Sequence, residues 1–299
     1  MKKLLVSVLA IAGLVACTQE TTLVQKGNAP MEFGGVFVEN ATRANTAVDP
    51  STTTESIKGF DVWGFMDSPE GVVFEDENVT GEQGKFTYDN TQYWIPGHTY
   101  YFAALAPMNS ANWDLDIAGA NTYGAGVLSF KNVDGTEDLL YAATAVDSPA
   151  LGEDKTVMFT FSHLLSKVKF SFVNAYEATN SSIRVKDIKI LNPYKTGNVV
   201  LNQNTTWSNQ AVDATTPLTL NFGHAASNAA TENIAMLFDY GTTYESYNEL
   251  LMIPGAGPYT DANNDNKKCY TVQFTVELLV NNAVIKTYDH TIHTSFVPE

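Results

Sequence analysis

Apolar and polar residues alternate along much of this chain, and the alternation predicts β-strands. In residues 270–280 every even position is apolar, from Val272 to Val280, while most odd positions are polar. A period of two is expected for a half-buried strand, because successive side chains point to opposite faces of a sheet. Asn281-Asn282 then predicts a tight turn into a second strand over 284–288.

Residues 167–172 alternate as clearly as residues 270–280, with lysine or serine at the odd positions. A strand here would therefore place Lys169 in solvent and its apolar neighbours in the interior. We expect these two strands to share one core. The residues that contribute to it are Val168, Phe170, Phe172, Phe274, Val276 and Leu278.

A change of parity marks an irregular strand near Asp187. Ile183 and Val185 are odd-numbered whereas Ile188 and Ile190 are even-numbered, so the inward face changes between them. A β-bulge, which inserts one extra residue, explains such a change. We expect further short strands at 60–66, 99–106, 138–144 and 157–161. Short strands separated by frequent turns predict an all-β fold of sandwiches or barrels.

The first seventeen residues have the pattern of an export signal. Lys2 and Lys3 precede a mostly apolar run over 4–15, which is shorter than the roughly 20 residues that a transmembrane helix requires. The run ends in Leu14-Val15-Ala16-Cys17, which resembles a bacterial lipobox, where the cysteine is acylated and becomes the mature N-terminus. Cys17 is therefore the predicted lipidation site. The alternative is an ordinary signal peptide in which this cysteine is incidental.

The rest of the chain divides by composition. Residues 17–30 are polar and aperiodic, as expected for a flexible tether. Near Ser162 one strand signal ends and another begins, which favours a domain boundary there. We therefore expect a lipoprotein signal peptide over 1–16, a tether over 17–30, an N-terminal β-sandwich domain over 31–162 and a C-terminal β-sandwich domain over 163–299.

Charge and cysteine content exclude some classes of protein. The chain carries a formal net charge of −16 and has no basic cluster. Such a chain is not expected to bind nucleic acid or anionic lipid head groups. Cys269 is the only cysteine beyond Cys17, so no disulfide can form within the mature chain.

Candidate catalytic and metal-binding residues are few. His163 continues the parity of Phe159 and Phe161, which favours a partly buried structural histidine over a catalytic base. Residues 261–265 imitate the start of a calcium loop, but Asn266 stands where that loop requires glycine. No nucleophile motif or phosphate-binding loop is present. We therefore predict no enzymatic activity, no cofactor and no metal site.

Residues 31–44 combine a strand pattern with an accessible basic residue. Met31, Phe33, Gly35 and Phe37 share one face of the predicted strand. Arg43 follows in a polar stretch and precedes Ala44, which suits a protease that cleaves after arginine. Two interpretations stay open from these residues alone. The segment is either a plain edge strand followed by a loop, or a strand that proteolysis removes.

Residues 159–170 resemble the central signature of the fimbrillin-like proteins of Bacteroides and relatives. The signature reads Phe-Thr-Phe-Ser-His-Leu-Leu-Ser-Lys-Val-Lys-Phe in this chain. Trp94-Ile95-Pro96-Gly97, residues 100–107 and Asp138-Leu139-Leu140-Tyr141-Ala142 occur in the order expected for that family. The resemblance covers roughly residue 31 to the end of the chain.

The resemblance implies two tandem transthyretin-like, antiparallel β-sandwich domains and a role as a structural subunit of a type V pilus. In that family a lipidated precursor reaches the outer membrane, and an arginine-specific protease removes the first strand, here after Arg43. The opened groove then accepts a strand from another pilus subunit, and the fibre supports adhesion to a host or bacterial surface receptor.

The chain departs from the family pattern at its C-terminal end, and a second function stays open. Family members usually end in a further strand that acts as donor, whereas this chain ends at Val297-Pro298-Glu299. Either the chain is shortened or the subunit has a special position, such as tip or anchor. The alternative function is a lipid-anchored tip adhesin or surface glycan-binding module, in which sugars would stack on Trp63, Trp94, Trp113 and Trp207.

Overall fold

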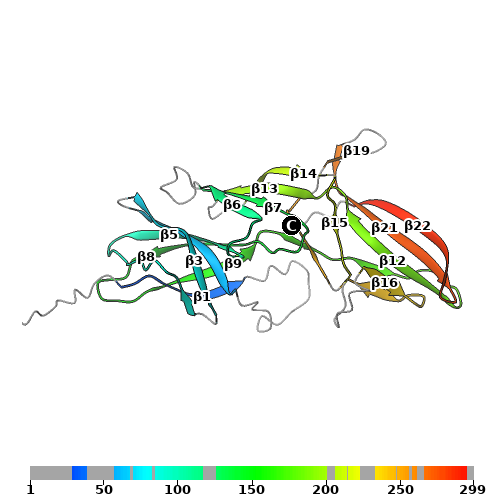
Figure 1. Ribbon diagram of the computed structural model, residues 1–299, viewed down its shortest axis with the longest axis horizontal. Coiled ribbons are helices and arrows are strands. Elements are labelled where there is room, and N and C mark those ends of the chain that lie inside the picture. The colour runs from blue at the N-terminus through cyan, green and yellow to red at the C-terminus, as the bar shows by residue number, and fades with distance from the viewer. Residues whose placement is uncertain are drawn as a thin grey trace, which may run out of the picture.

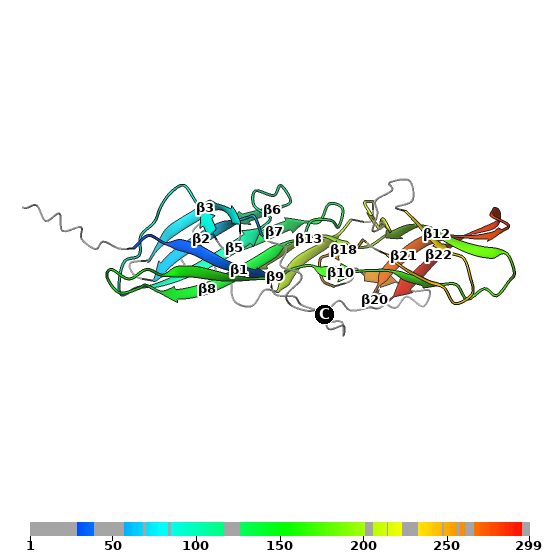
Figure 2. The same cartoon turned by 90° about the horizontal axis from the view of Figure 1, so that it is seen from below.

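A computed structural model of the chain describes residues 29–38, 57–67, 70–82, 85–116, 126–200, 206–213, 215–222, 233–246, 248–255, 258–260 and 266–294. Every regular element in these residues is a β-strand, which confirms the all-β prediction. The strands form two lobes at opposite ends of an elongated molecule (Figures 1 and 2). The described residues contain no helix of the length and apolarity needed to cross a bilayer.

The N-terminal lobe is organised by a seven-stranded sheet. The sheet order is β1-β9-β8-β5-β2-β3-β4. Strand β1 runs parallel to β9, and the other neighbouring pairs are antiparallel. The strands are β1 (Glu32–Val38), β9 (Thr156–His163), β8 (Leu140–Asp147), β5 (Thr99–Ala106), β2 (Gly59–Asp67), β3 (Glu70–Glu82) and β4 (Lys85–Thr87).

Apolar side chains pack against both faces of this sheet. One core contains Phe60, Phe102 and Phe159, and a second core on the opposite face contains Trp63 and Leu105. Strands β2 and β5 therefore bury both of their faces. Strands buried on both faces read as nearly continuous apolar runs, which explains why these two segments lack clean alternation.

A four-stranded sheet covers the second core and joins the two halves of the chain. Its order is β14-β13-β7-β6, and in Figure 1 it lies above the N-terminal lobe and reaches toward the C-terminal lobe. Its strands are β6 (Trp113–Asp116), β7 (Val127–Lys131), β13 (Tyr194–Val200) and β14 (Trp207–Val212). Strands from both sides of residue 162 thus build one sheet. The expected domain boundary at Ser162 and the transthyretin-like detail stay predictions.

The C-terminal lobe packs a larger sheet against two short strand pairs. The sheet order is β15-β12-β21-β22, and β16 also pairs with β12. Its strands are β15 (Leu218–Thr219), β12 (Ser181–Ile190), β21 (Tyr270–Val280), β22 (Ala283–Thr294) and β16 (Ile234–Leu237). Opposite lie β10 (Ser166–Val168) with β18 (Leu250–Met252), and β11 (Ser171–Val173) with β17 (Thr243–Glu245). A separate pair joins β19 (Pro258–Thr260) to β20 (Asn266–Lys268).

Local sequence rules place several features of this lobe correctly. Strand β21 spans the predicted 270–280. Asn281 and Asn282 have positive φ values of 48° and 64°, as a two-residue hairpin turn requires. Asp187 has a φ of 58°, and the β12–β21 register shifts between Lys186 and Lys189. The predicted bulge is confirmed.

The predicted core of this lobe is largely correct. Five of its expected members pack in one apolar cluster, and Lys169 is exposed. Leu278 departs from the expectation, because it does not pack in this cluster, whereas Leu279 on the opposite face is buried. Val168 is a buried member of the cluster, and the partly buried residues that pack against it are Phe170, Phe172, Phe274 and Val276.

Candidate functional site

Strand β1 lies at the edge of the N-terminal sheet and is the candidate site of strand exchange. Its register places Phe33 opposite Val157 and, after an irregularity, Phe37 opposite Thr160. Parallel pairing is slightly less stable per residue than antiparallel pairing, and the irregularity interrupts the ladder. The strand is therefore held by modest backbone pairing on this side.

A second segment, 88–94, lies along the other side of residues 29–31. The backbone N–H of Met31 donates to the carbonyl of Gln92 at 2.8 Å, and the N–H of Trp94 donates to the carbonyl of Ala29 at 2.9 Å. The Tyr88 hydroxyl donates to the carbonyl of Met31 at 2.6 Å. Burial raises the pKa of Tyr88, so the hydroxyl stays protonated and able to donate. The start of β1 is thus bonded on both sides.

Side-chain packing contributes most of the hold on β1. Met31 is 1% exposed and Phe33 is 3% exposed, and both belong to the first core of the lobe. The Phe33 ring stacks on Phe159 at 5.8 Å between centroids. It also makes edge contacts with four other rings, those of Phe60, Phe74, Tyr88 and Phe102. One side chain of β1 therefore fills a socket with aromatic walls.

Strand β9 depends on β1 for much of its pairing. Strand β1 pairs with residues 156–161 of β9, whereas β8 pairs with Ser162 and His163. Val157, Phe159 and Phe161 of β9 are fully buried in the core that Phe33 completes. Loss of β1 would leave a polar backbone edge and an apolar socket exposed together.

The predicted site residues are found in two situations. Met31 and Phe33 point into the core as the alternation predicts, and Gly35 and Phe37 belong to β1. The lipidation residue Cys17 and the processing residues Arg43 and Ala44 lie outside the described residues. Their roles stay predictions. The segment 88–94 was not foreseen as part of the site, since no local pattern indicates what a distant loop contacts.

The signature segment 159–170 meets the segment 138–142, which also resembles the family. Leu140 pairs with His163, and the N–H of Leu164 donates to the carbonyl of Leu139 at 2.9 Å. His163 Nδ1 lies 2.7 Å from a carboxylate oxygen of Asp138, and both side chains are largely buried. His163 is thus the partly buried, partnered histidine that its parity indicates. The signature holds β8 and β9 together at this end.

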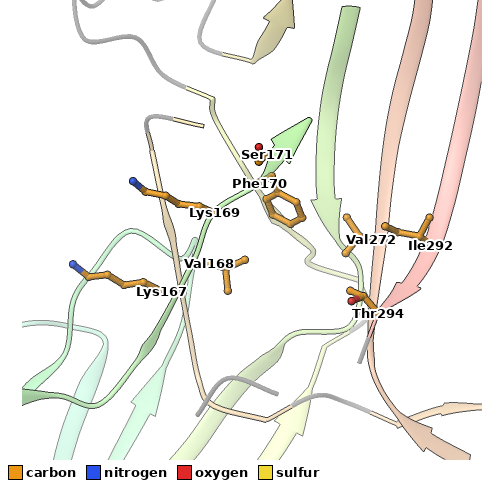
Figure 3. Close-up of a pocket in the computed structure, with 8 residues that line it drawn as sticks. All are labelled: Lys167, Val168, Lys169, Phe170, Ser171, Val272, Ile292 and Thr294. Carbon is orange, nitrogen blue, oxygen red and sulfur yellow. The ribbon is translucent and has the colours of Figure 1, made fainter. Parts of the chain in front are cut away.

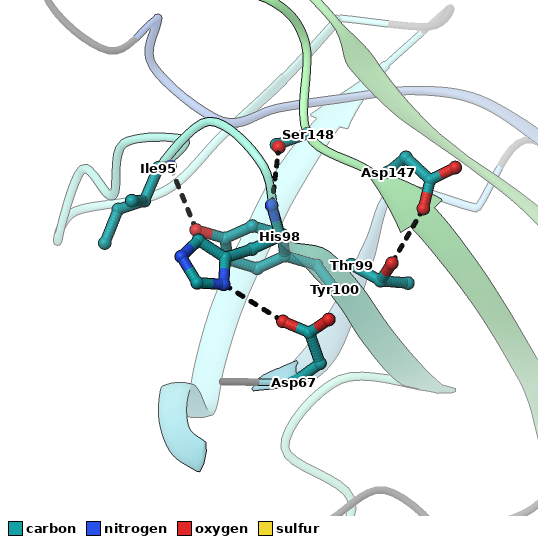
Figure 4. A network of polar contacts seen from close by, with 7 residues as sticks. All are labelled: Asp67, Ile95, His98, Thr99, Tyr100, Asp147 and Ser148. Atoms are coloured by element: carbon teal, nitrogen blue, oxygen red, sulfur yellow. Dashed lines mark hydrogen bonds and ion pairs between the residues drawn. The ribbon is translucent and has the colours of Figure 1, made fainter. Parts of the chain in front are cut away.

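A polar network at the far end of the lobe resembles a catalytic grouping only in its residue types. His98 Nδ1 lies 3.1 Å from Asp67, and Ser148 is nearby (Figure 4). However, the Ser148 hydroxyl accepts a hydrogen bond from the backbone N–H of His98, at 3.1 Å. A nucleophile would have to donate to the imidazole. The contacts brace the turn before β5, where the Tyr100 hydroxyl accepts from the N–H of Ile95 at 2.9 Å.

Metal ligation has no obvious centre in the described part of the chain. There, no group of three or more His, Cys, Asp or Glu side chains is placed to hold a metal ion. The loop 261–265, which imitates a calcium site in sequence, lies outside the described residues.

Comparison with known families decides the relationship of this chain. A family model described as fimbrillin-like matches residues 42–297. The chain belongs to the fimbrillin-like family. The resemblance seen in residues 159–170 is thereby confirmed. Membership of the fimbrillin-like family supports a role as a pilus subunit or adhesin at the cell surface.

Solved structures add similarities to this fimbrillin-like chain. A candidate cell adhesion protein from Bacteroides ovatus is similar with a TM-score of 0.48 and 17% identity, over 88% of this chain and 86% of that one. The fimbrial anchor protein Mfa2 from Porphyromonas gingivalis is similar with a TM-score of 0.36 and 13% identity, over 87% of this chain and 82% of that one. Among curated proteins, none matches.

Proposed function

We propose that this chain is a structural subunit of a type V pilus that assembles by exchange of strand β1. In this proposal the precursor is anchored in the outer membrane through acylated Cys17, and an arginine-specific protease cleaves it after Arg43. The β1 edge is the observation that supports the proposal. Strand β1 closes the lobe, because its start is bonded on two sides and its Phe33 side chain fills an aromatic socket. Its parallel ladder with β9, however, is short and irregular.

Strand removal supplies the driving force for assembly. The vacated edge of β9 would present unpaired backbone groups beside the socket of Phe60, Phe102 and Phe159. An incoming strand from another subunit can satisfy both, which is the physics of β-augmentation. The donor is a segment of a neighbouring subunit with apolar side chains at alternate positions.

The arginine content makes processing specific. The chain contains two arginines, Arg43 and Arg184. Arg184 lies within β12 between β16 and β21, and its guanidinium pairs with the buried carboxylate of Glu277. A protease requires an extended, accessible segment, so the folded chain offers Arg184 poorly. Cleavage after Arg43 would leave a product of residues 44–299.

Arginine-specific digestion of the purified precursor tests the proposal. We expect one cut, a product beginning at Ala44, and conversion of monomer to polymer ladders that resist unheated detergent gels. Arg43→Ala should stay monomeric under the same digestion, while Arg184→Lys should still be cut and assemble. Polymerisation without cleavage, or a polymer whose subunits begin at Cys17, would contradict the mechanism.

The adhesin alternative loses one of its supports. Trp63 and Trp94 are buried. Trp113 and Trp207 donate their indole N–H groups to the backbone carbonyls of Pro107 and Leu164 at 3.1 and 2.9 Å. The tryptophans therefore brace the lobes, and a sugar-stacking platform built on them is not favoured. Glycan-array binding by the unprocessed monomer would favour the alternative.

A further inference from the structure

Strand β22 is a long exposed edge in the C-terminal lobe. Among the described strands it pairs with β21 alone, and all of its residues except Thr294 are exposed. Its large apolar side chains include Ile285 at 58% exposure and Ile292 at 45%. Sheet edges in native proteins are usually short, charged or covered, since an open edge templates pairing with another chain. An exposed edge of twelve residues that carries several large apolar side chains therefore has the character of an interaction surface.

The inner face of β22 extends past the core of its lobe. Ile292 lies opposite Val272, and Tyr288 lies opposite Val276. The β21 members pack in the core cluster, whereas the β22 members are exposed. Val168 and Phe170 point toward Val272 and Ile292 across the intervening space (Figure 3). The layer that contains β10 and β11 thus covers β21 but leaves β22 uncovered.

This arrangement leaves a groove of about 410 Å³ between β22 and residues 167–171. Ile292 and Thr294 line one wall, and the 167–171 segment lines the other (Figure 3). The groove has the lateral walls that an added strand requires, since each wall is a strand or strand segment.

Both walls present backbone groups to the groove. The N–H of Phe170 donates to the Ser246 hydroxyl, and its carbonyl accepts from the N–H of Ser246. Phe170 therefore faces β17, and its neighbours Lys169 and Ser171 face the opposite way. On the other wall, the Thr271 carbonyl accepts from Leu191 of the β12 side. Since backbone direction alternates along a strand, Thr291 directs its N–H and carbonyl away from β21.

The N-terminal lobe shows what fills the equivalent place. There β1 lies between the last strand of its lobe, β9, and the segment 92–94, to which Met31 and Ala29 are bonded. Met31 and Phe33 point inward and Glu32 is exposed. In the C-terminal lobe, β22 and the 167–171 segment flank an open groove, where an added strand would likewise lie between two stretches of backbone.

Charge around the groove favours a strand with an outward carboxylate. Lys167 and Lys169 share one carboxylate, that of Glu249, at 3.5 and 3.3 Å. These two lysines place positive side chains beside the groove in a chain whose net charge is −16. In Figure 3 both lysines point away from the groove interior, which is the side on which Glu32 of an inserted β1 would lie.

We propose that the groove between β22 and the 167–171 segment binds the β1 segment of a second copy of this chain. Met31 and Phe33 would cover Ile292 and Phe170, and Glu32 would pair with Lys167 and Lys169. The groove belongs to the intact chain, and the inference rests on the proposed function only for the supply of a released β1. The site would retain the segment that processing removes.

Binding of a synthetic peptide of residues 29–38 to the intact, uncleaved chain tests this inference. In that chain the β1 position of the N-terminal lobe is occupied, so a failure of processing or exchange leaves the result unaffected. We expect saturable binding, measured by fluorescence anisotropy. Lys167→Glu together with Lys169→Glu should weaken it by roughly tenfold or more, because both attractions to Glu32 become repulsions. Thr291→Pro should abolish binding, because proline removes the N–H that faces the groove.

Matched controls separate the groove from other sites. Lys58→Glu with Lys85→Glu, an equal charge change on the other lobe, should leave affinity within about twofold. A peptide carrying Glu32→Lys should bind the native chain poorly and bind the Lys167→Glu, Lys169→Glu chain better. Circular dichroism must show that each variant is folded. Absence of saturable binding, or binding that all groove variants retain, would overturn the inference.

Discussion

Strands β9 and β22 are the last strands of the two lobes in chain order, but the outer sides of the two strands have opposite surroundings. Strand β9 is covered along its edge by β1, and its inward residues Val157, Phe159 and Phe161 are fully buried. Strand β22 has no such cover among the described strands, and Tyr288 and Ile292 on its inward face are exposed. The difference lies in one added strand rather than in the composition of the sheets. In the two proposals above, the N-terminal edge gives up a strand and the C-terminal edge receives one.

The largest expected difference between the two edges is in the loss of stability when one apolar side chain at each edge is truncated. Phe33→Ala should lower the free energy of unfolding by about 3–5 kcal/mol, since the ring is buried among five aromatic rings. Ile292→Ala should cost below about 0.5 kcal/mol, because the side chain is exposed. Urea unfolding measures both values. Similar losses would mean that β1 does not close its lobe as described.

A buried carboxylate on the C-terminal lobe should stabilise it. Glu277 is buried, lies 2.8 Å from Lys186 Nζ and also pairs with Arg184. The hydrogen bonds from these groups lower the pKa of Glu277. The stability that ionised Glu277 contributes is therefore present above the unfolded-state pKa and is lost as pH falls through the folded-state pKa. Glu277→Gln should cost about 2–3 kcal/mol at pH 7 and progressively less in acid.

The corresponding measurement is urea unfolding of both proteins from pH 7 downward. Ser181→Ala, which removes a hydrogen bond from a hydroxyl to the neutral carbonyl of Ala178 at the start of β12, provides the control and should show no such pH dependence. A Glu277→Gln penalty that grows in acid would contradict the assigned ion pairs.

A buried carboxylate on the N-terminal lobe, that of Asp61, should give stability the opposite dependence on pH. Asp61 is 1% exposed, and burial raises its pKa to about 6 despite hydrogen bonds from Asn78 and from the N–H of Asn109. A raised pKa contributes stability that is fully present below the unfolded-state value and is lost as pH rises through about 6. Asp61→Asn should therefore change the free energy of unfolding more favourably at pH 8 than at pH 4, by about 1–2 kcal/mol. A pH-independent difference in unfolding free energy between the two proteins would refute this assignment.

Amide exchange should give the finest contrast within β22. Tyr288 and Ile292 direct their N–H groups toward β21, whereas Thr287 and Thr291 direct theirs to the open edge. Amides of Thr287 and Thr291 should exchange faster than those of Tyr288 and Ile292 by roughly tenfold or more, and saturating β1 peptide should slow them. Uniform exchange along β22 in the free protein would show that its edge is already covered.

Local features of the fold followed from local residues. The bulge at Asp187 and the turn at Asn281-Asn282 were predictable because parity and turn chemistry act over a few positions. The inward face of β1 was predictable for the same reason, and Met31 and Phe33 are buried as expected. The alternation predicted the wrong leucine as buried at 278, since position 279 is apolar as well and the register with β22 shifts there.

Non-local features were out of reach of the pattern. Nothing in residues 31–38 indicates parallel pairing with a strand more than a hundred positions away, or a bond from Tyr88 to the carbonyl of Met31. The sequence pattern does not indicate the pairing of β13 with β7 either, because alternation shows which face of a strand is buried and not which strand lies beside it. The candidate site could thus be located along the chain but not assembled from it.

The shared sheet has a mechanical consequence. Strands β7 and β13 come from opposite sides of residue 162, and five consecutive residue pairs, from Val127–Val200 to Lys131–Thr196, join them. Both strands run close to the long axis of the molecule (Figure 1). Tension between the lobes would stretch these bonds in shear, so that they must yield together instead of opening one after another. A fibre made of such subunits would resist pulling at the joint of each subunit instead of bending there.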